Sequence, residues 1–311
     1  MKIGFFGTPE VARGLLSHLC SNYDVCFVVT NCDKPAGRNK KVCKPPVKMC
    51  AEENNVEILQ PETLKDELLV EHLKSFNADL FIVFAYGHLI PASVFEMPRY
   101  GTINLHPSKL PLYRGAAPVE WALMDGVSET AVSIQKITEK LDAGDILAQQ
   151  NITIDPDMNA RELYEKVMPL GISLVDHVIK GFKDDSLNPV KQNESQATYC
   201  KKISRSTARI DWNMKALQIH NLVRAMNPKP GAWSLFRDTE IKVWQTAIVP
   251  QDQMIDLKPG QLARLGKKRL VAGCGDGIIE IISIQPLGKK PMEASAFING
   301  ARLSDDESFQ A

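Results

Sequence analysis

The chain has 311 residues, of which 44% are hydrophobic and 24% are charged. This length and mixture suffice for two globular domains with buried cores, and they exclude an intrinsically disordered chain. No apolar run approaches the roughly 20 residues that span a bilayer, and the N-terminus lacks a signal-peptide pattern, so a cytoplasmic protein is expected. Seven cysteines, none in a C-x-x-C pair, predict neither a disulfide framework nor a zinc site.

The formal net charge is zero, yet the charges are unevenly distributed. Residues 200–311 hold 17 Lys or Arg and 11 Asp or Glu, a net of +6, which leaves 20 against 26, or −6, for residues 1–199. A basic segment on a neutral protein fits a polyanionic partner such as a nucleic acid, but an excess of lysine fits a solvated surface as well.

The first two thirds of the chain alternate strand and helix patterns. Apolar runs predict strands at 2–7, 24–31, 56–59 and 78–87. Amphipathic segments predict helices at 11–19, 46–55 and 62–76. Continuous apolar strands separated by helices predict a mostly parallel sheet that is covered on both faces, which is an α/β fold.

Further elements follow the strand that contains Ile103. The patterns predict a helix at 115–126, strands at 130–137 and 145–154, and a helix at 159–182. Pro169 lies inside the last helix, so a kink or break is expected near Met168.

Residues 183–199 are polar, rich in turn formers and without periodicity, and they predict a linker. Beyond it, a short helix at 214–226 precedes strand patterns at 231–236, 240–249, 269–274 and 277–287. This spacing is typical of a small antiparallel barrel. The predicted organisation is a catalytic domain at 1–182, a linker at 183–199 and a basic, β-rich domain at 200–311.

The turn GFFGTPE after the first strand lacks the second and third glycines of the G-x-G-x-x-G fingerprint, so it predicts a tight strand-to-helix turn rather than an NAD site. Open parallel sheets bind ligands at the carboxyl ends of their strands. The stretches AYGHLIP, from Ala85, and NLHPS, from Asn104, lie at such ends.

Asn104, His106 and Ser108 occupy alternate positions, so an extended chain would place them on one face. Asn104 and His106 could donate hydrogen bonds to charge that develops on a carbonyl oxygen. Ser108 could instead be a nucleophile with His106 as its base, although two side chains at this spacing on one strand point in parallel. In a third alternative, Asn104 and His106 merely bond to neighbouring backbone groups.

Asp142 lies in the turn EKLDAGDIL, between two predicted strands. A carboxylate there could accept a proton, or it could orient a histidine and favour its protonated form. Aspartate is also common in turns for local hydrogen bonding. Asn104, His106 and Asp142 together fit the transfer of an acyl-like carbonyl to an incoming amine.

The pattern N-x-H-x-S-x-L-P at 104–111, continued by RGAAP at 114–118 and followed by LDAG at 141–144, resembles the folate-dependent formyltransferases. The resemblance extends from GTPE and DKPAGRNKK near the start to ARIDW and RAMNPKPGAW in the second domain. Within that family the chain resembles the members that formylate methionyl-tRNA.

This resemblance implies a Rossmann-like formyltransferase domain and a C-terminal domain that resembles an OB-fold. It implies 10-formyltetrahydrofolate as the co-substrate, no metal, initiator methionyl-tRNA as the acceptor, and a monomeric enzyme. Asn104 and His106 would hold the oxyanion, while Asp142 would assist proton movement. Folate would contact Ser108, Lys109, Leu110 and Pro111, together with the backbone around Ala85, Tyr86, Gly87 and Leu89. Lys109 departs from the pattern, in which an apolar residue is expected.

A basic loop completes the expectations. Six basic residues lie between Asp33 and Lys48 with a single acid, a density suited to neutralising phosphates. The resemblance implies that such a loop reaches the tRNA acceptor stem, through Arg38, Lys40, Lys41 and Lys44. A solvated basic loop is the alternative.

For the function of the whole chain, two alternatives remain. One is a formyltransferase with another amine acceptor, such as a nucleotide sugar, although the two-domain enzymes that act on such sugars are expected in longer chains. The other is a non-catalytic nucleic-acid-binding protein.

Overall fold

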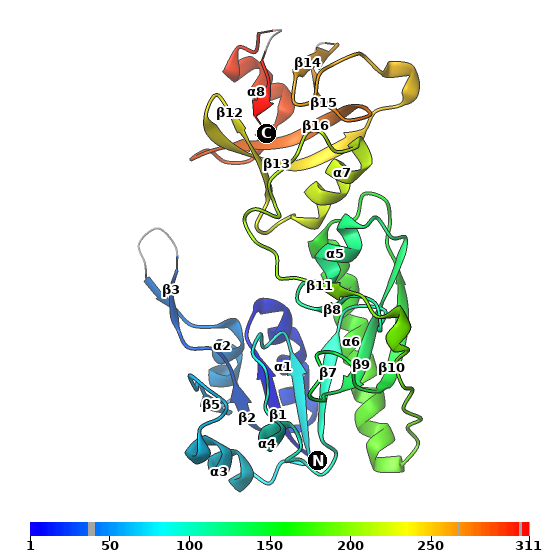
Figure 1. Ribbon diagram of the computed structural model, residues 1–311. Coiled ribbons are helices and arrows are strands. Elements are labelled where there is room, and N and C mark those ends of the chain that lie inside the picture. Colours follow the sequence, from blue (N-terminus) through cyan, green and yellow to red (C-terminus); the bar gives the residue numbers. More distant parts are fainter. Residues whose placement is uncertain (37–40, 267, 305–306, 311) are drawn as a thin grey trace. The chain divides into compact units, whose positions relative to one another are not determined.

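The computed structural model describes residues 1–36, 41–266, 268–304 and 307–310 (Figure 1). It divides into two compact units. The first comprises Met1–Pro118, Glu129–Thr153 and Tyr164–Cys200, and the second comprises Val119–Ser128, Ile154–Leu163 and Lys201–Ala311. The segment 183–199, predicted as a linker, thus belongs to the first unit, and two short segments from within 1–182 belong to the second.

The first unit is built on a seven-stranded sheet. Its strands are β1 (Lys2–Gly7), β2 (Asp24–Val29), β5 (Glu57–Leu59), β6 (Leu80–Phe84), β7 (Thr102–His106), β9 (Glu129–Lys136) and β10 (Ile146–Thr153). The spatial order is β10-β9-β7-β6-β1-β2-β5. The strands from β7 to β5 are parallel, whereas β9 pairs antiparallel with β7, and β10 with β9. The predicted mostly parallel α/β sheet is confirmed.

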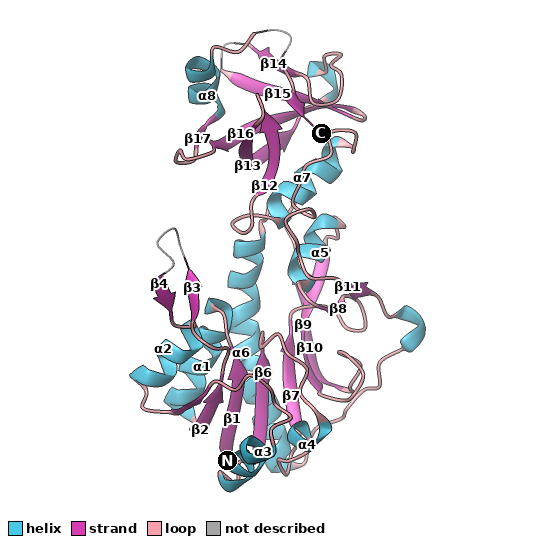
Figure 2. Ribbon diagram, turned by 60° about the vertical axis from the view of Figure 1, so that its left-hand side comes forward, coloured by secondary structure: helices cyan, strands magenta, loops and turns pink. Residues whose placement is uncertain are grey.

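Helices cover both faces of this sheet (Figure 2). They are α1 (Glu10–Asn22), α2 (Pro46–Glu53), α3 (Glu67–Ser75), α4 (Ala92–Phe95) and α6 (Ala160–Asp184). α1 lies between α2 and α6, because Arg13 bonds to Glu53 of α2 and His18 to Asp176 of α6. On the face of the sheet opposite α1, Leu73 of α3 and Val94 of α4 pack against a cluster of aromatic side chains that the strands contribute.

That cluster explains why β1 contains a glycine. Phe6, Phe27 and Phe81 come from three adjacent strands, with the ring of Phe27 6.0 Å from that of Phe6 and 5.3 Å from that of Phe81. A Cβ at Gly4 would lie 2.2 Å from Cζ of Phe27. Gly4 therefore makes room for rings that bury much more apolar surface than a small side chain could.

The face of each β7 residue follows from this packing. Leu105 faces α6, where its side chain lies against Gly171. Since side chains alternate along a strand, Asn104 and His106 point to the opposite face. Ser108 lies beyond the end of β7 in a bend, so the alternation does not extend to it.

α6 continues through Pro169, so the predicted break does not occur. Proline removes one hydrogen bond of the helix and leaves the carbonyl four residues earlier without its usual donor. Pro169 is exposed, which gives water access to this part of the helix. The buried side chains of Leu163, Val167 and Val175 share one face, and their packing holds the helix together on both sides of the proline.

The second unit contains an antiparallel sheet. Its strands are β12 (Ala232–Phe236), β13 (Thr239–Ile248), β14 (Leu262–Leu265), β15 (Arg269–Cys274), β16 (Gly277–Pro286), β17 (Met292–Glu293) and β18 (Phe309–Gln310), in the order β14-β15-β16-β13-β12-β18 with β17 on β16. The predicted C-terminal β domain is confirmed at this level. Trp212 stacks on Phe309 in its interior, with ring centroids 4.8 Å apart.

Helix α7 (Ala216–Ala225) joins separate segments of the second unit. The buried guanidinium of Arg224 donates hydrogen bonds to the carbonyl oxygens of Met158, at 3.1 Å, and Leu123, at 3.3 Å. Leu123 belongs to helix α5 (Pro118–Met124). These bonds explain why segments from the first two thirds of the chain belong to this unit.

Candidate active site

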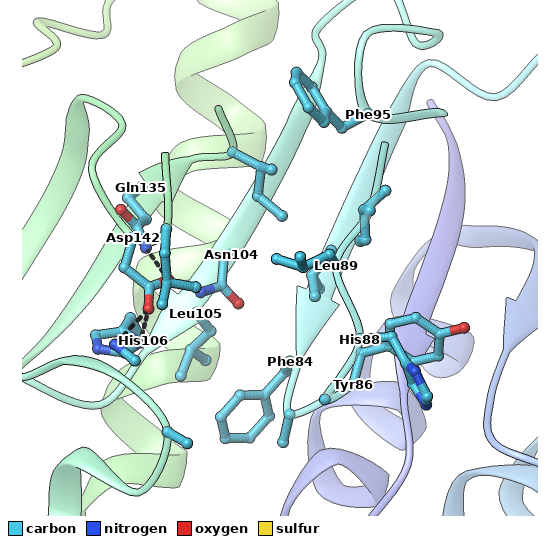
Figure 3. A pocket seen from close by; sticks show the side chains of 18 of the residues that line it. Phe84, Tyr86, His88, Leu89, Phe95, Asn104, Leu105, His106, Gln135 and Asp142 are labelled. Carbon is cyan, nitrogen blue, oxygen red and sulfur yellow. Dashed lines mark hydrogen bonds and ion pairs between the residues drawn. The ribbon is translucent and has the colours of Figure 1, made fainter. Parts of the chain in front are cut away.

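A cavity of about 780 Å³ lies in the first unit, at the carboxyl ends of β6 and β7 (Figure 3). Its lining includes the turn after β6, the end of β7 and the loop that joins β9 to β10. The location agrees with the rule that open parallel sheets bind ligands beyond the carboxyl ends of their strands.

The turn after β6 forms one wall. Ala85 and Gly87 both have positive φ, 51° and 82°, so the chain reverses sharply after Phe84. Because Ala85 carries only a methyl group and Gly87 has no side chain, the peptide groups of the turn can approach a ligand closely. Tyr86 is buried beside them, and burial raises the pKa of its phenol to about 12, so its hydroxyl stays protonated at neutral pH. Leu89, by contrast, is 81% exposed.

The opposite wall brings together the three residues predicted to be catalytic, as Figure 3 shows. Asn104 Nδ2 lies 3.4 Å from Asp142 Oδ1, within hydrogen-bond distance. His106 Nδ1 lies 3.8 Å from Asp142 Oδ2. An amide, an imidazole and a carboxylate from two distant stretches of chain therefore meet at one edge of the cavity.

The surroundings of His106 determine which of its nitrogens is available. Nε2 is 2.9 Å from the carbonyl oxygen of Tyr113, and a carbonyl only accepts, so Nε2 carries a proton. Nδ1 then faces Asp142. In the neutral ring Nδ1 accepts a proton, and only in the doubly protonated ring can it donate one.

Asp142 is held by partners that sequence reasoning did not identify. Its Oδ2 accepts from the backbone N–H of Gly115 at 2.8 Å, and its Oδ1 accepts from Gln135 Nε2 at 2.8 Å. The backbone of Asp142 is left-handed, with φ 50°. Such a conformation is uncommon for a residue other than glycine, and surrounding contacts must hold it.

Residues 108–111 are all described, and none of them lines the cavity. Ser108 is fully buried and its hydroxyl donates to the carbonyl of Leu112 at 2.7 Å, so it does not face the cavity as a nucleophile would. Lys109 pairs with Glu129, and Leu110 is buried.

The basic loop is only partly described. Arg38 and Lys40 lie outside the described residues, and so does the side chain of Lys41. Short strands β3 (Lys34–Ala36) and β4 (Lys41–Cys43) pair antiparallel beside this gap. Lys44 Nζ is 2.8 Å from the carboxylate of Glu52, and that hydrogen bond raises the pKa of Lys44.

Lys48 likewise bonds to Asp33 at 2.8 Å, and this bond is the main cause of the lowered pKa of Asp33. Some of the loop's positive charge is thus already balanced within the chain.

Among the described residues, no three His, Cys, Asp or Glu side chains are grouped so as to hold a metal ion. None of the helices in the described ranges has the length and apolar character needed to cross a bilayer.

Both parts of the chain match known families. Residues 1–179 match the formyl transferase model, and residues 202–302 match the model of the formyl transferase C-terminal domain. The chain belongs to the formyltransferase family.

Individual relatives match along nearly their whole length. The methionyl-tRNA formyltransferase of Leptospira interrogans is 40% identical over 314 residues, which cover 99% of this chain and all of the relative. That of Lachnospira eligens is 37% identical over 307 residues, covering 97% of this chain and 98% of the relative.

Solved structures share the fold. The sugar 3N-formyltransferase WlaRD, determined with dTDP and 5-N-formyl-THF, has a TM-score of 0.66 at 21% identity and covers 93% of this chain and 99% of its own. HypX from Aquifex aeolicus in complex with tetrahydrofolic acid has a TM-score of 0.64 at 18% identity and covers all of this chain but 51% of its own. The match covers 99% of the sugar enzyme's chain, although two-domain sugar formyltransferases were expected in longer chains.

Proposed function

We propose that this formyltransferase transfers the formyl group of 10-formyltetrahydrofolate to the α-amine of methionine on initiator tRNA, giving N-formylmethionyl-tRNA for translation initiation. One observation carries the proposal: the amide of Asn104, the imidazole of His106 and the carboxylate of Asp142 meet at the edge of a cavity of about 780 Å³. The acceptor is proposed from the relatives named methionyl-tRNA formyltransferase, which this chain matches over nearly its full length.

The chemistry of the polar wall suits transfer of a formyl group to an amine. As the amine attacks, negative charge develops on the formyl oxygen. Asn104 Nδ2 carries two protons, so it can bond to Asp142 and still donate to that oxygen. His106 can donate from Nδ1 when the ring is doubly protonated, because Nε2 is committed to Tyr113. Asp142 can accept the proton that the amine loses, directly or through His106 or a water.

The opposite wall is the proposed place for the pterin ring of the folate. Ala85, Tyr86, Gly87 and Leu89 line that side of the cavity, where the turn offers backbone polar groups and Leu89 offers an exposed apolar side chain. A flat ring with polar edges needs such a mixture of apolar surface and a few directed polar groups. A direct contact of folate with Ser108, Lys109, Leu110 or Pro111 has less support, because none of them lines the cavity.

The proposed tRNA contacts lie in the basic loop and in the second unit. Arg38, Lys40, Lys41 and Lys44 would bind phosphates of the acceptor stem. Lys44 would have to exchange its bond with Glu52 for one with a phosphate, so we expect it to contribute less than an unpaired lysine would. The +6 charge of residues 200–311 would hold the tRNA backbone without reading its sequence.

An OB-like barrel is proposed for the second unit. The order β14-β15-β16-β13-β12-β18 leaves β14 and β18 at the two edges. Support for closure comes from hydrogen bonds between the chain just before β18 and that leading into β14, from Leu262 N to Glu307 O and from Phe309 N to Gly260 O, both at 2.8 Å. OB-folds are partly open five-stranded barrels that commonly bind nucleic acids.

A nucleotide sugar is the alternative acceptor, favoured by the structural match to the sugar 3N-formyltransferase. The first experiment therefore compares charged initiator tRNA, charged elongator tRNA and a nucleotide-linked amino sugar, with 10-formyltetrahydrofolate as the donor. We expect formylation of initiator methionyl-tRNA above both other acceptors. Product from the amino sugar alone would support the alternative, and no product from any of them would point to a non-catalytic nucleic-acid-binding protein.

Two further expectations accompany the proposal. A monomeric enzyme is part of the proposal, as the resemblance implies. Translation initiation takes place in the cytoplasm, so this function would place the protein there.

A further inference from the structure

The side chain of Gln192 connects the segment that follows α6 to the candidate active site. Its Nε2 lies 2.9 Å from the carbonyl oxygen of Asp142, 2.7 Å from that of Gly144 and 3.1 Å from Oε1 of Gln135. Its Oε1 accepts from Nε and Nη2 of Arg114, at 3.1 and 2.9 Å. Both ends of one amide are therefore engaged.

Chemistry fixes the orientation of this amide. Arginine can only donate, so the oxygen of Gln192 must face Arg114, and backbone carbonyls can only accept, so its nitrogen must face Asp142 and Gly144. A flipped amide would place like groups against each other on both sides. The orientation thus follows from the partners alone.

The partners of Gln192 Nε2 belong to the loop between β9 and β10, whose shape needs outside support. Asp142 is left-handed at φ 50°. A Cβ at Gly144 would lie only 1.9 Å from the carbonyl oxygen of Lys136, so the loop closes tightly at this point. Conformations of this kind persist only where neighbouring contacts hold them.

A second route runs from Gln192 to the carboxylate itself. Gln192 donates to Gln135 Oε1, and Gln135 Nε2 donates to Asp142 Oδ1 at 2.8 Å. Arg114, Gln192 and Gln135 thus form a chain of donors that all point toward the carboxylate. Aligned hydrogen bonds of this kind polarise one another.

Arg114 is a firm anchor for this chain. Its side chain is fully buried, and Glu194 and Tyr199, from the same segment as Gln192, accept further bonds from it. Gln192 is consequently held from one side and holds the loop on the other.

We propose that Gln192 is a positioning residue for the formyl transfer: its amide nitrogen keeps the carboxylate of Asp142 aimed at Asn104 and His106. The inference rests on the proposed function, since it concerns the geometry of that reaction. It also gives residues 183–199 a part in catalysis, although they were predicted to be only a linker.

Gln192→Glu separates this role from simple tethering. Glutamate keeps oxygens for Arg114 and gains an ion pair, but it loses both N–H donors and turns an anion toward two carbonyls. If Gln192 only tethers its segment to Arg114, the variant should have the same kcat as the wild type. If it positions Asp142, kcat should fall by about 10- to 100-fold, since displacements near 1 Å can cost this much, while KM for the folate changes little.

Three measurements accompany the rates. The thermal unfolding midpoint of Gln192→Glu should stay near that of the wild type, because the anchor on Arg114 is kept. Hydrogen–deuterium exchange of residues 137–145 should be faster in this variant. Asn193→Ala is the matched control: its side chain is exposed and bonds to Ser195, so rates and exchange should not change.

The outcomes separate the two proposals. If the wild-type protein gives no formylated product with any acceptor, the proposed function fails, and the exchange of residues 137–145 still decides whether Gln192 holds the loop. Unchanged exchange in Gln192→Glu would overturn the inference. An active enzyme whose kcat is unaffected by this substitution would overturn it equally.

Discussion

The two walls of the cavity are held in different ways. On the polar wall, His106 donates a hydrogen bond to the carbonyl oxygen of Tyr113. Asp142 accepts hydrogen bonds from Asn104 and from the backbone N–H of Gly115. On the opposite wall the shape comes from the backbone turn at Ala85 and Gly87, and the side chain of Leu89 is largely free of contacts. The polar wall therefore suits the reaction itself, which needs fixed distances, and the turn suits binding, which tolerates adjustment.

His106→Ala should break the polar wall most severely. Loss of one hydrogen-bond donor to a developing oxyanion costs about 2.7–4 kcal/mol, or about 100- to 1000-fold in kcat. Binding of tRNA should stay nearly unchanged, because the imidazole is buried against Asp142 and Tyr113. Steady-state rates and a binding titration test this, and a collapse of tRNA affinity would contradict the assigned role.

Two glycines, Gly87 in the turn after β6 and Gly144 in the loop that carries Asp142, sharpen the comparison. Gly144→Ala forces the carbonyl of Lys136 to move, because the new Cβ would lie 1.9 Å from it, so kcat should fall by about 10- to 100-fold. No described atom lies within 4 Å of a Cβ built at Gly87, whose φ is +82°. Gly87→Ala should therefore cost about 1–2 kcal/mol of stability through its backbone and leave kcat nearly intact. Equal losses of kcat in both variants would remove the distinction between the walls.

Leu89→Ala should affect binding rather than the reaction. The side chain lines the cavity but is 81% exposed, so a folate that covers it would lose about 1 kcal/mol of apolar contact, or about fivefold in KM. Leu68→Ala is the control, since Leu68 is 82% exposed on α3 and is not part of the lining. A larger effect on kcat than on KM would show that this wall also positions the reacting groups.

The smallest predicted effect is on stability at low pH, and it comes from a histidine outside the cavity. His220 is buried, and burial is the main cause of its lowered pKa, which Asp157 partly opposes. Below about pH 6.5 the unfolded chain binds a proton that the folded chain still resists, so the free energy of unfolding should fall there, until the folded histidine is protonated as well. His220→Gln should reduce this loss in urea titrations at several pH values. The same substitution at exposed His177 is the control, and an identical pH dependence in both variants would contradict the explanation.

Sequence patterns identified the sheet and the residues on its polar edge, because buried strands and polar groups at their ends are local signals. Asn104 and His106 stand out within one strand, and Asp142 within a short turn. Gln135 and Gln192 could not be found in this way. Both lie in segments where a glutamine gives no sign of a functional role. Only the folded chain brings Nε2 of Gln192 within 3.1 Å of Oε1 of Gln135.

The same limit explains the other differences. Pro169 signals a helix break locally, but packing of the flanking turns on the sheet outweighs it. The residues from 183 to 199 lack periodicity because only short pieces of them belong to regular elements, and side chains such as Glu194 and Gln192 hold the rest. For Ser108, alternation predicted the wrong direction because β7 ends at His106.

The bonds of Arg224 have a consequence for how this protein can change over time. The guanidinium recognises main-chain oxygens of Leu123 and Met158, which any amino acid would supply. Mutations at those two positions can therefore accumulate without removing the bonds, provided that the backbone path is kept. Replacement of Arg224 itself would leave both carbonyls without this donor at once, so the tolerance of the two segments depends on a single side chain.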